Sequence, residues 1–177
     1  MTDLPHEAIA DFVRDSLSRH DSYTSYYDRD YHQNLEYGQP FFKEMKETMA
    51  EATQEFYIHS GRKGLVVKPA DVKVWYSEYK EGDSHATHCH PNSTAAGTYW
   101  PYSDDNSSAI KFHNPNRIPV MMLPCQGTLS SEIGYEKIPK TGEMSVWPAW
   151  LEHEVKRQGK VEDPDCTRIA ISWNVKL

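Results

Sequence analysis

The stretch that decides the fold is TRIAISWNV, residues 167–175, near the carboxyl end of the chain. Successive side chains of a β-strand point to opposite faces, so one face here carries Arg168, Ala170, Ser172 and Asn174. The opposite face then carries Ile169, Ile171, Trp173 and Val175. This alternation predicts a strand with one apolar, core-facing side and one side that holds polar groups.

Seven further runs of similar character precede this strand, separated by Gly, Pro, Asn and Asp. They are short and rich in β-branched and aromatic residues, which favours strands. The runs are LVVKP (65–69), DVKVWYSEYK (71–80), TAAGTYW (94–100), AIKFH (109–113), IPVMML (118–123), SEIGYEKI (131–138) and EMSVWP (143–148). Strands at this spacing predict an antiparallel sandwich or barrel.

The first third of the chain predicts helices instead, because its apolar residues recur at helical spacing. One helix is expected from about Leu4 to Leu17, and a second from Phe41 to Phe56. We therefore expect a single domain over residues 1–177, in which a helical flank (1–60) covers one outer face of a strand-rich core (64–177).

A tyrosine-rich segment, residues 22–37, joins the two expected helices and contains five tyrosines. Tyrosine combines an apolar ring with a polar hydroxyl, so it suits both buried contacts and binding surfaces. The segment therefore predicts either an aromatic connection packed on the domain or a lid over a binding site.

Composition narrows the class of function. The chain has 19 basic and 26 acidic residues, giving a net charge of −7, which disfavours binding to nucleic acids or anionic membranes. No apolar run approaches the roughly 20 residues needed to span a bilayer. The amino terminus lacks the features of a signal peptide, and the three cysteines are far apart. We therefore expect a cytoplasmic protein with reduced thiols.

Histidines crowd into GDSHATHCHPNS, residues 82–93, where His88 and His90 form the single His-x-His of the chain. On a strand, residues two apart share a face, so these imidazoles can converge on one metal ion. His153, in WPAWLEHEV, is the natural third ligand from another strand. His85 is a reserve, because on an uninterrupted strand it faces away from His88. A solvated surface cluster of histidines is the alternative.

Arg168 is the second feature that points to a binding site. A guanidinium is costly to bury unpaired in a core strand, and it offers a planar pair of donors to a carboxylate. Ala170 leaves room beside it, and Ser172 adds a hydroxyl two residues along. The strand therefore predicts either a carboxylate-binding seat or an internal salt bridge to an acidic residue.

Four blocks together resemble the small iron(II)- and 2-oxoglutarate-dependent oxygenases of phages and bacteria. They are H-x-H-P-N-S (88–93), G-T-Y (97–99), W-P-A-W-L-x-H-x-V (147–155) and R-I-A-I-S-W-N (168–174). The resemblance covers about residues 70 to 175. It implies a mostly β fold with flanking helices, whose core is a double-stranded β-helix, or jelly roll.

The resemblance also implies a function and its residues. Iron(II) and 2-oxoglutarate would be the cofactors, and a small-molecule or peptide substrate would be hydroxylated with release of succinate and CO2. His88, His90 and His153 would hold the metal, and Arg168 would grip the far carboxylate of 2-oxoglutarate, assisted by Ser172. Tyr99 would lie near the cosubstrate, although Trp100 or Tyr102 could face inward instead.

One departure from the family pattern leaves the ligand set open. The superfamily usually carries Asp or Glu two residues after the first His, and no histidine here has one. Either His90 replaces the carboxylate, or Asp83 or Glu154 supplies it. Three histidines are also the ligands of cupins and of some zinc sites. A cupin-type enzyme without 2-oxoglutarate, or a non-catalytic jelly-roll binding module, is therefore the alternative.

Overall fold

A computed structural model describes residues 3–17, 39–116, 133–158 and 168–176 of the chain. These residues form two helices, a short 3-10 turn and eight strands: α1 (His6–Leu17), α3 (Pro40–His59), η3 (Pro69–Asp71), β1 (Val72–Tyr79), β2 (His85–His88), β3 (Ala95–Tyr102), β4 (Ile110–His113), β5 (Gly134–Lys137), β6 (Met144–Pro148), β7 (His153–Val155) and β8 (Arg168–Val175). No helix among the described residues is long and apolar enough to cross a membrane.

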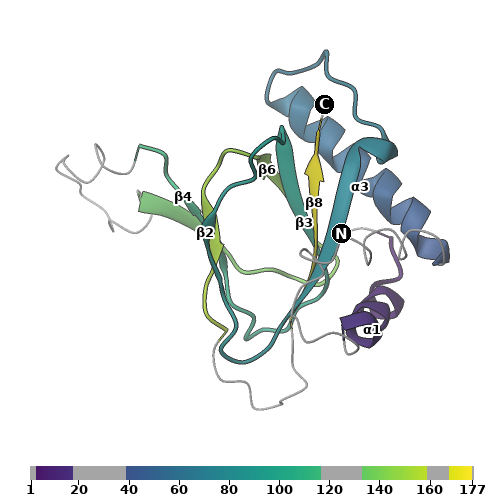
Figure 1. Cartoon of the computed structure of the whole chain (residues 1–177), viewed down its shortest axis with the longest axis vertical. Helices are drawn as coiled ribbons and strands as arrows, with labels where there is room; N and C mark the ends of the chain where they lie inside the picture. The colour runs from purple at the N-terminus through teal and green to yellow at the C-terminus, as the bar shows by residue number, and fades with distance from the viewer. Residues whose placement is uncertain (1–2, 18–38, 117–132, 159–167, 177) are drawn as a thin grey trace.

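The strands form two four-stranded sheets in which every pairing is antiparallel. The larger sheet has the order β1-β8-β3-β6, and the smaller has the order β2-β7-β4-β5. Their inner faces meet in one apolar cluster, which contains Ala170 and Trp100 from the larger sheet and Ile110 and Val155 from the smaller. The expected antiparallel sandwich is therefore present, and both helices lie on the far side of the larger sheet (Figure 1).

The pleat of β8 separates two environments, as the sequence alternation predicted. Ile169, Ile171, Trp173 and Val175 pack under the helices, in a cluster that includes Ile9 and Val13 of α1 and Met45 and Met49 of α3. Arg168, Ala170 and Ser172 face the space between the sheets. One strand thus contributes both to the apolar core and to a polar interior wall.

Helix α3 begins at Pro40, whose fixed φ suits the first turn of a helix. Its buried face is slightly rotated from the expected stripe, because Thr53 and Tyr57 are buried while Phe56 is half-exposed. Both polar side chains have partners in or directly next to the larger sheet. Thr53 Oγ1 accepts from Trp173 Nε1 at 3.1 Å, and Tyr57 Oη lies 2.6 Å from Thr94 Oγ1.

One expected strand is wrong. Residues 65–68 of LVVKP have no strand partner, because the side chain of Gln54 in α3 takes up their backbone groups. Gln54 Nε2 donates to the carbonyl of Leu65 at 2.8 Å, and Gln54 Oε1 accepts from the amide of Val67 at 3.0 Å. Two other expectations, the strand at 118–123 and the tyrosine-rich segment 22–37, lie outside the described residues.

Gly97 yields a direct test of the packing between α3 and the larger sheet. A Cβ added to Gly97 would lie 2.3 Å from Trp173 Cζ2, so the indole would have to move and lose its hydrogen bond to Thr53. We expect Gly97→Ala to lower the free energy of unfolding by roughly 1–3 kcal/mol, the usual cost of overpacking a core. Urea denaturation followed by tryptophan fluorescence would measure it.

Gly64→Ala is the matched control, since a Cβ at Gly64 meets nothing within 4 Å. Its unfolding midpoint should stay close to that of the parent chain, within about 0.5 kcal/mol. Equal midpoints for both variants would contradict the packing of Trp173 against Gly97.

Candidate metal centre

Three histidines from two neighbouring strands converge at one end of the space between the sheets. His88 is the last residue of β2, and His153, the first of β7, is its partner across the strand pair. His90 lies just beyond β2, where its amide donates to the carbonyl of Ala149 at 2.8 Å. Each residue offers one nitrogen, and the three nitrogens lie within 4.8 Å of one another. The structure therefore brings together the three histidines singled out from the sequence.

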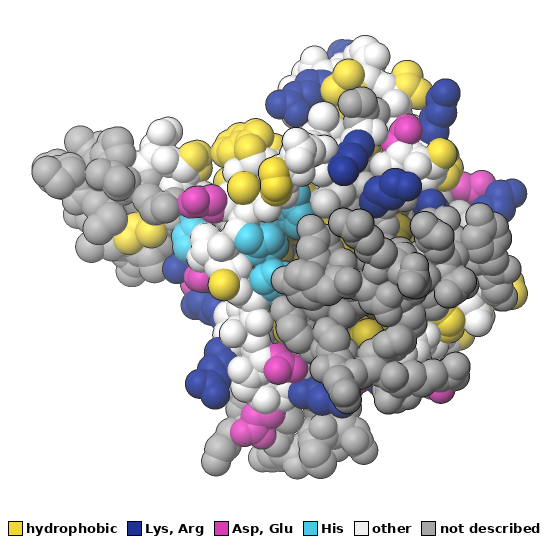
Figure 2. All heavy atoms as spheres, in the orientation of Figure 1, with side chains coloured by type: hydrophobic (Ala, Val, Ile, Leu, Met, Phe, Trp, Pro, Cys, Tyr) yellow, Lys and Arg dark blue, Asp and Glu magenta, His cyan; other side chains and the backbone are white. Residues whose placement is uncertain are grey.

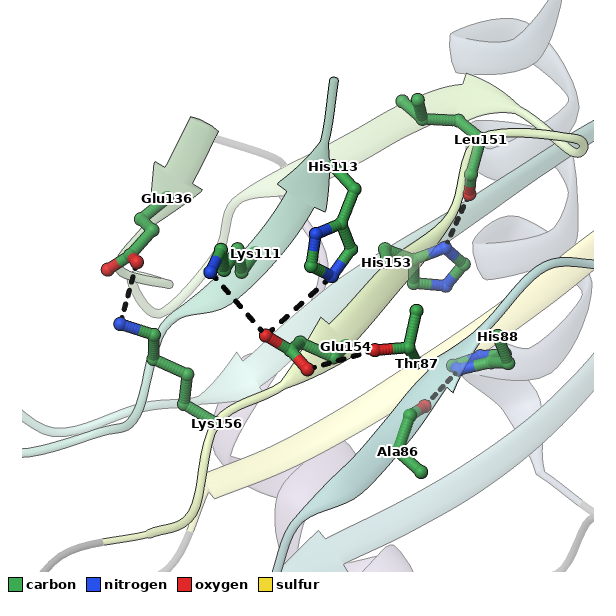
Figure 3. A network of polar contacts seen from close by, with 10 residues as sticks. All are labelled: Ala86, Thr87, His88, Lys111, His113, Glu136, Leu151, His153, Glu154 and Lys156. Atoms are coloured by element: carbon green, nitrogen blue, oxygen red, sulfur yellow. Dashed lines mark hydrogen bonds and ion pairs between the residues drawn. The ribbon is translucent and has the colours of Figure 1, made fainter. Parts of the chain in front are cut away.

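Backbone carbonyls orient two of these rings. His88 Nδ1 lies 2.8 Å from the carbonyl of Ala86, and His153 Nδ1 lies 2.9 Å from that of Leu151 (Figure 3). A carbonyl only accepts, so each Nδ1 carries the proton and each Nε2 keeps its lone pair. This arrangement is the usual one around metal-binding histidines.

The spacing of the nitrogens fits a single metal ion. His90 Nε2 lies 3.2 Å from His153 Nε2. Two nitrogens that each bind a metal at about 2.0–2.1 Å, with an angle of about 90–110° between them, are separated by about 2.8–3.4 Å. The observed separation falls in that range, so the rings of His90 and His153 are spaced to bind one metal ion.

Burial keeps the three imidazoles uncharged. It is the main reason that the pKa of His153 falls to about 3 and that of His90 to about 4, and it also lowers the pKa of His88. His88 further depresses the other two pKa values, because neighbouring positive charges would repel. Neutral imidazoles have the lone pair that a metal requires, so no proton has to leave before one binds at neutral pH.

Neither carboxylate considered as a third ligand reaches this centre. Asp83 Oδ2 accepts the amide of Lys80 at 2.8 Å in a turn before β2. Glu154 is on the opposite face of β7 from His153, where Glu154 Oε2 accepts from Thr87 Oγ1 at 3.0 Å (Figure 3). Among the described residues, the group able to hold a metal consists of the three histidines alone. The structure thus favours the three-histidine set.

The outer face of the ligand-bearing strands carries a polar network of its own. Glu154 Oε1 lies 3.8 Å from Lys111 Nζ and 3.7 Å from His113 Nε2, and both partners belong to β4 (Figure 3). With the contact from Thr87, Glu154 links β2, β7 and β4 by side chains. Strands β2 and β7 pair at only two positions, His85↔Val155 and His88↔His153. The contacts of Glu154 therefore help to hold together the strands that carry His88 and His153.

A cavity that is partly open to solvent extends from the three histidines between the two sheets. Its walls include Trp75, Ser77 and Tyr79 of β1, together with Thr98 of β3 and Trp147 of β6. Histidine side chains reach the surface in the view of Figure 2, near strand β2. The cavity that His85, His88, His90 and His153 line is itself partly open to solvent.

Arg168 lines the same cavity and is only 2% exposed. Its Nη1 donates to the carbonyl of Ser108 at 2.7 Å, and its guanidinium carbon lies 4.5 Å from the ring centre of Tyr79. No described carboxylate pairs with it, and its Nε has no hydrogen-bond partner in the described part of the chain. Burial lowers the pKa of Arg168, as expected for a cation removed from water. A salt bridge from Arg168 to an acidic residue, the second sequence-based interpretation, is therefore not present among the described residues.

Ser172 and Tyr99 fall on opposite faces of the larger sheet. Ser172 lines the cavity, and its hydroxyl lies 3.0 Å from that of Thr98. Tyr99 packs in the helix-covered cluster and its hydroxyl contacts His6 Nδ1, so the expectation that it reaches the cosubstrate is corrected. The pleat gives the reason, since Tyr99 alternates with Thr98 and Trp100, and Trp100 belongs to the inner cluster.

His85 also departs from its expected position. The register of β2 against β7 shifts between His85 and His88, and this irregularity turns His85 into the cavity. Its ring stacks on that of His88, with centroids 4.1 Å apart and planes 17° apart. Burial, then His88 and Arg168, lower the pKa of His85 to about 4.

Sequence reasoning missed the contribution of β1 to the cavity. Trp75, Ser77 and Tyr79 alternate along DVKVWYSEYK, so their shared face could have been found from period-two alternation. The Trp75 ring lies 5.8 Å from that of His90, and Tyr79 supports Arg168. This strand therefore connects the two polar ends of the cavity.

Comparisons with known structures agree with the fold. A prolyl-4-hydroxylase from Pseudomonas putida superposes with a TM-score of 0.61 at 11% identity, over 98% of this chain and 82% of its own. A 2OG-Fe(II) oxygenase family oxidoreductase from Burkholderia pseudomallei gives a TM-score of 0.50 at 11% identity, over 77% of this chain and 58% of its own. At such identities the likeness shows the jelly-roll fold alone, which confirms the expected fold class. A search of curated protein sequences found no match.

The family is shown by the sequence itself. The model of the family described as "Putative 2OG-Fe(II) oxygenase" matches residues 73–174, which is 102 of the 177 residues. The match begins in β1 and ends in β8, so it spans the three histidines and Arg168. The chain therefore belongs to the 2OG-Fe(II) oxygenase family.

Proposed function

We propose that the protein is an iron(II)- and 2-oxoglutarate-dependent oxygenase that hydroxylates a small-molecule or peptide substrate. One observation carries the proposal: a single cavity has three convergent neutral imidazoles at one end and, at the other, a buried guanidinium without a carboxylate partner among the described residues. A metal ion suits the first end, and an anion suits the second. A small dicarboxylic acid that also binds metal matches both.

His88, His90 and His153 are the proposed iron ligands. Their rings are held in place by the carbonyls of Ala86 and Leu151 and by the backbone of Ala149. Iron(II) and 2-oxoglutarate, when bound, supply the activation of dioxygen that releases succinate and CO2. The chain's own part is to hold the two groups in a fixed relation and to keep water from the reacting end.

Arg168 is the proposed partner of the far carboxylate of 2-oxoglutarate. Its Nη1 donates a hydrogen bond to the carbonyl of Ser108, and its Nε is a buried donor without a partner among the described residues. A buried donor that makes no hydrogen bond costs free energy, so the binding of a carboxylate at this position would be strongly favoured. The hydroxyls of Ser172 and Thr98 lie on the same inner wall and can add a donor.

The metal ligands can be tested by titrating cobalt(II) into the protein and following its visible absorption. The parent chain should bind one equivalent, whereas His88→Ala and His153→Ala should lose stoichiometric binding, because each removes one of three ligands. Asp83→Asn and Glu154→Gln are the controls, since both residues face away from the three histidines. A loss in a control as large as that in His88→Ala would restore a carboxylate to the ligand set.

The carboxylate seat can be tested by calorimetric titration of 2-oxoglutarate into the cobalt-loaded protein. Breaking a buried charge pair typically costs about 2–5 kcal/mol, so Arg168→Leu should lower affinity by at least about 30-fold. Arg168→Lys should have a smaller effect, because it keeps the charge but loses the planar fork. Cobalt affinity should survive both changes. Unchanged 2-oxoglutarate affinity in Arg168→Leu would move the assignment to a cupin-type enzyme.

The reaction class can be tested by measuring succinate formed from 2-oxoglutarate with iron(II) and ascorbate. The parent chain should release succinate slowly without a substrate and faster with a suitable one. The Arg168→Leu variant, which keeps the metal ligands, should release much less at the same 2-oxoglutarate concentration. Succinate release that is equal with and without the protein would refute the proposed reaction.

A further inference from the structure

We propose that His85 is a positioning residue that helps the cavity select a 2-oxo acid with a second carboxylate. The inference deepens the proposed function and rests on it. The family pattern and the proposed ligand set leave His85 without a role. It is drawn into the cavity by the irregularity in β2, and such irregularities are common beside active sites, where they re-aim a side chain.

A continuous wall of side chains connects the two polar ends of the cavity. Arg168 lies over the ring of Tyr79 at 4.5 Å, and Tyr79 Oη is 3.5 Å from His85 Nδ1, at the outer limit of a hydrogen bond. The ring of His85 then stacks on His88 with centroids 4.1 Å apart. All four side chains line the same cavity. His85 therefore lies between the proposed metal ligands and the guanidinium.

The strand registers place His85 on the Arg168 side of the metal-binding histidines. His85 pairs with Val155, two residues along β7 from His153, which pairs with His88. Val155 pairs in turn with Ile110 of β4. Ile110 is two residues from Ser108, whose carbonyl accepts a hydrogen bond from Arg168 Nη1. An acid that extends from the three histidines to Arg168 would have to pass His85.

An imidazole in this position can donate to the acid. Nδ1 of His85 faces Tyr79, so we assign the contact with the far carboxylate to Nε2. A neutral imidazole has one N–H, which adds a hydrogen bond to a carboxylate that Arg168 already attracts. The hydroxyl of Tyr79, close to Nδ1, and the stacked ring of His88 would keep the imidazole of His85 in the required orientation.

The test compares two acids in calorimetric titrations of the cobalt-loaded protein. One is 2-oxoglutarate, and the other is 2-oxobutyrate, which can chelate the metal but lacks the far carboxylate. His85→Phe keeps a flat ring against His88 and removes the N–H. It should lower the affinity for 2-oxoglutarate by about 10-fold or more, as expected for a hydrogen bond to a charged group. Affinities for cobalt and 2-oxobutyrate should change by less than about 3-fold.

Two further variants separate the hydrogen bond from the fold. His85→Gln places an amide near the position of Nε2 and should recover most of the 2-oxoglutarate affinity. Ser84→Ala, at an exposed position next to His85, should leave the ratio of the two affinities unchanged. An unchanged ratio in His85→Phe, or no recovery in His85→Gln, would overturn the inference. Failure of the parent chain to bind 2-oxoglutarate would instead overturn the proposed function on which it rests.

Discussion

Strand β8 has to satisfy two incompatible environments, and the rest of the molecule is arranged around that constraint. Its outer side chains are apolar and are covered by α1 and α3, with Trp173 lying against Gly97 and donating to Thr53. Its inner side chains begin with Arg168, a cation that is 2% exposed and has no carboxylate partner in the described part of the chain. The apolar side stabilises the strand, and the energetic cost of the buried cation is what makes an anionic ligand favourable there.

The smaller sheet carries the three histidines, which would hold the metal ion that such an anion binds in addition to Arg168. Strands β2 and β7 meet at two positions only, and the metal-binding end is completed by backbone carbonyls that orient His88 and His153. Three neutral imidazoles would leave the full charge of a bound divalent ion uncompensated. A carboxylate ligand from the protein would remove part of that charge, so the proposed acidic cosubstrate would have more charge to neutralise here than in the commoner two-histidine, one-carboxylate arrangement.

Period-two alternation allowed much of this to be predicted from sequence, because each side chain on a regular strand has only two choices of face. The two faces of β8 follow from it, whereas His90 lies beyond β2, where its amide donates to the carbonyl of Ala149. The wrong predictions concern features that alternation alone does not determine. An irregularity in β2 turns His85 into the cavity, and Tyr99 lies on the helix-covered face of β3 because alternation does not say which of the two faces is the inner one. Residues Leu65 and Val67 join no sheet because their backbone groups bond to the side chain of Gln54. Alternation could also have excluded Glu154 as a ligand, because it follows His153 directly on β7 and so faces the opposite side, where it contacts Thr87.

A crystal structure of the protein grown anaerobically with iron(II) and 2-oxoglutarate would test the central claim most directly. An anomalous difference map recorded at the iron edge locates the metal independently of any fitted side chain. We expect one peak bound by the Nε2 atoms of His88, His90 and His153, with 2-oxoglutarate chelating it and its far carboxylate on Arg168. A peak elsewhere, a protein carboxylate on the metal, or an acid that does not reach Arg168 would contradict the account.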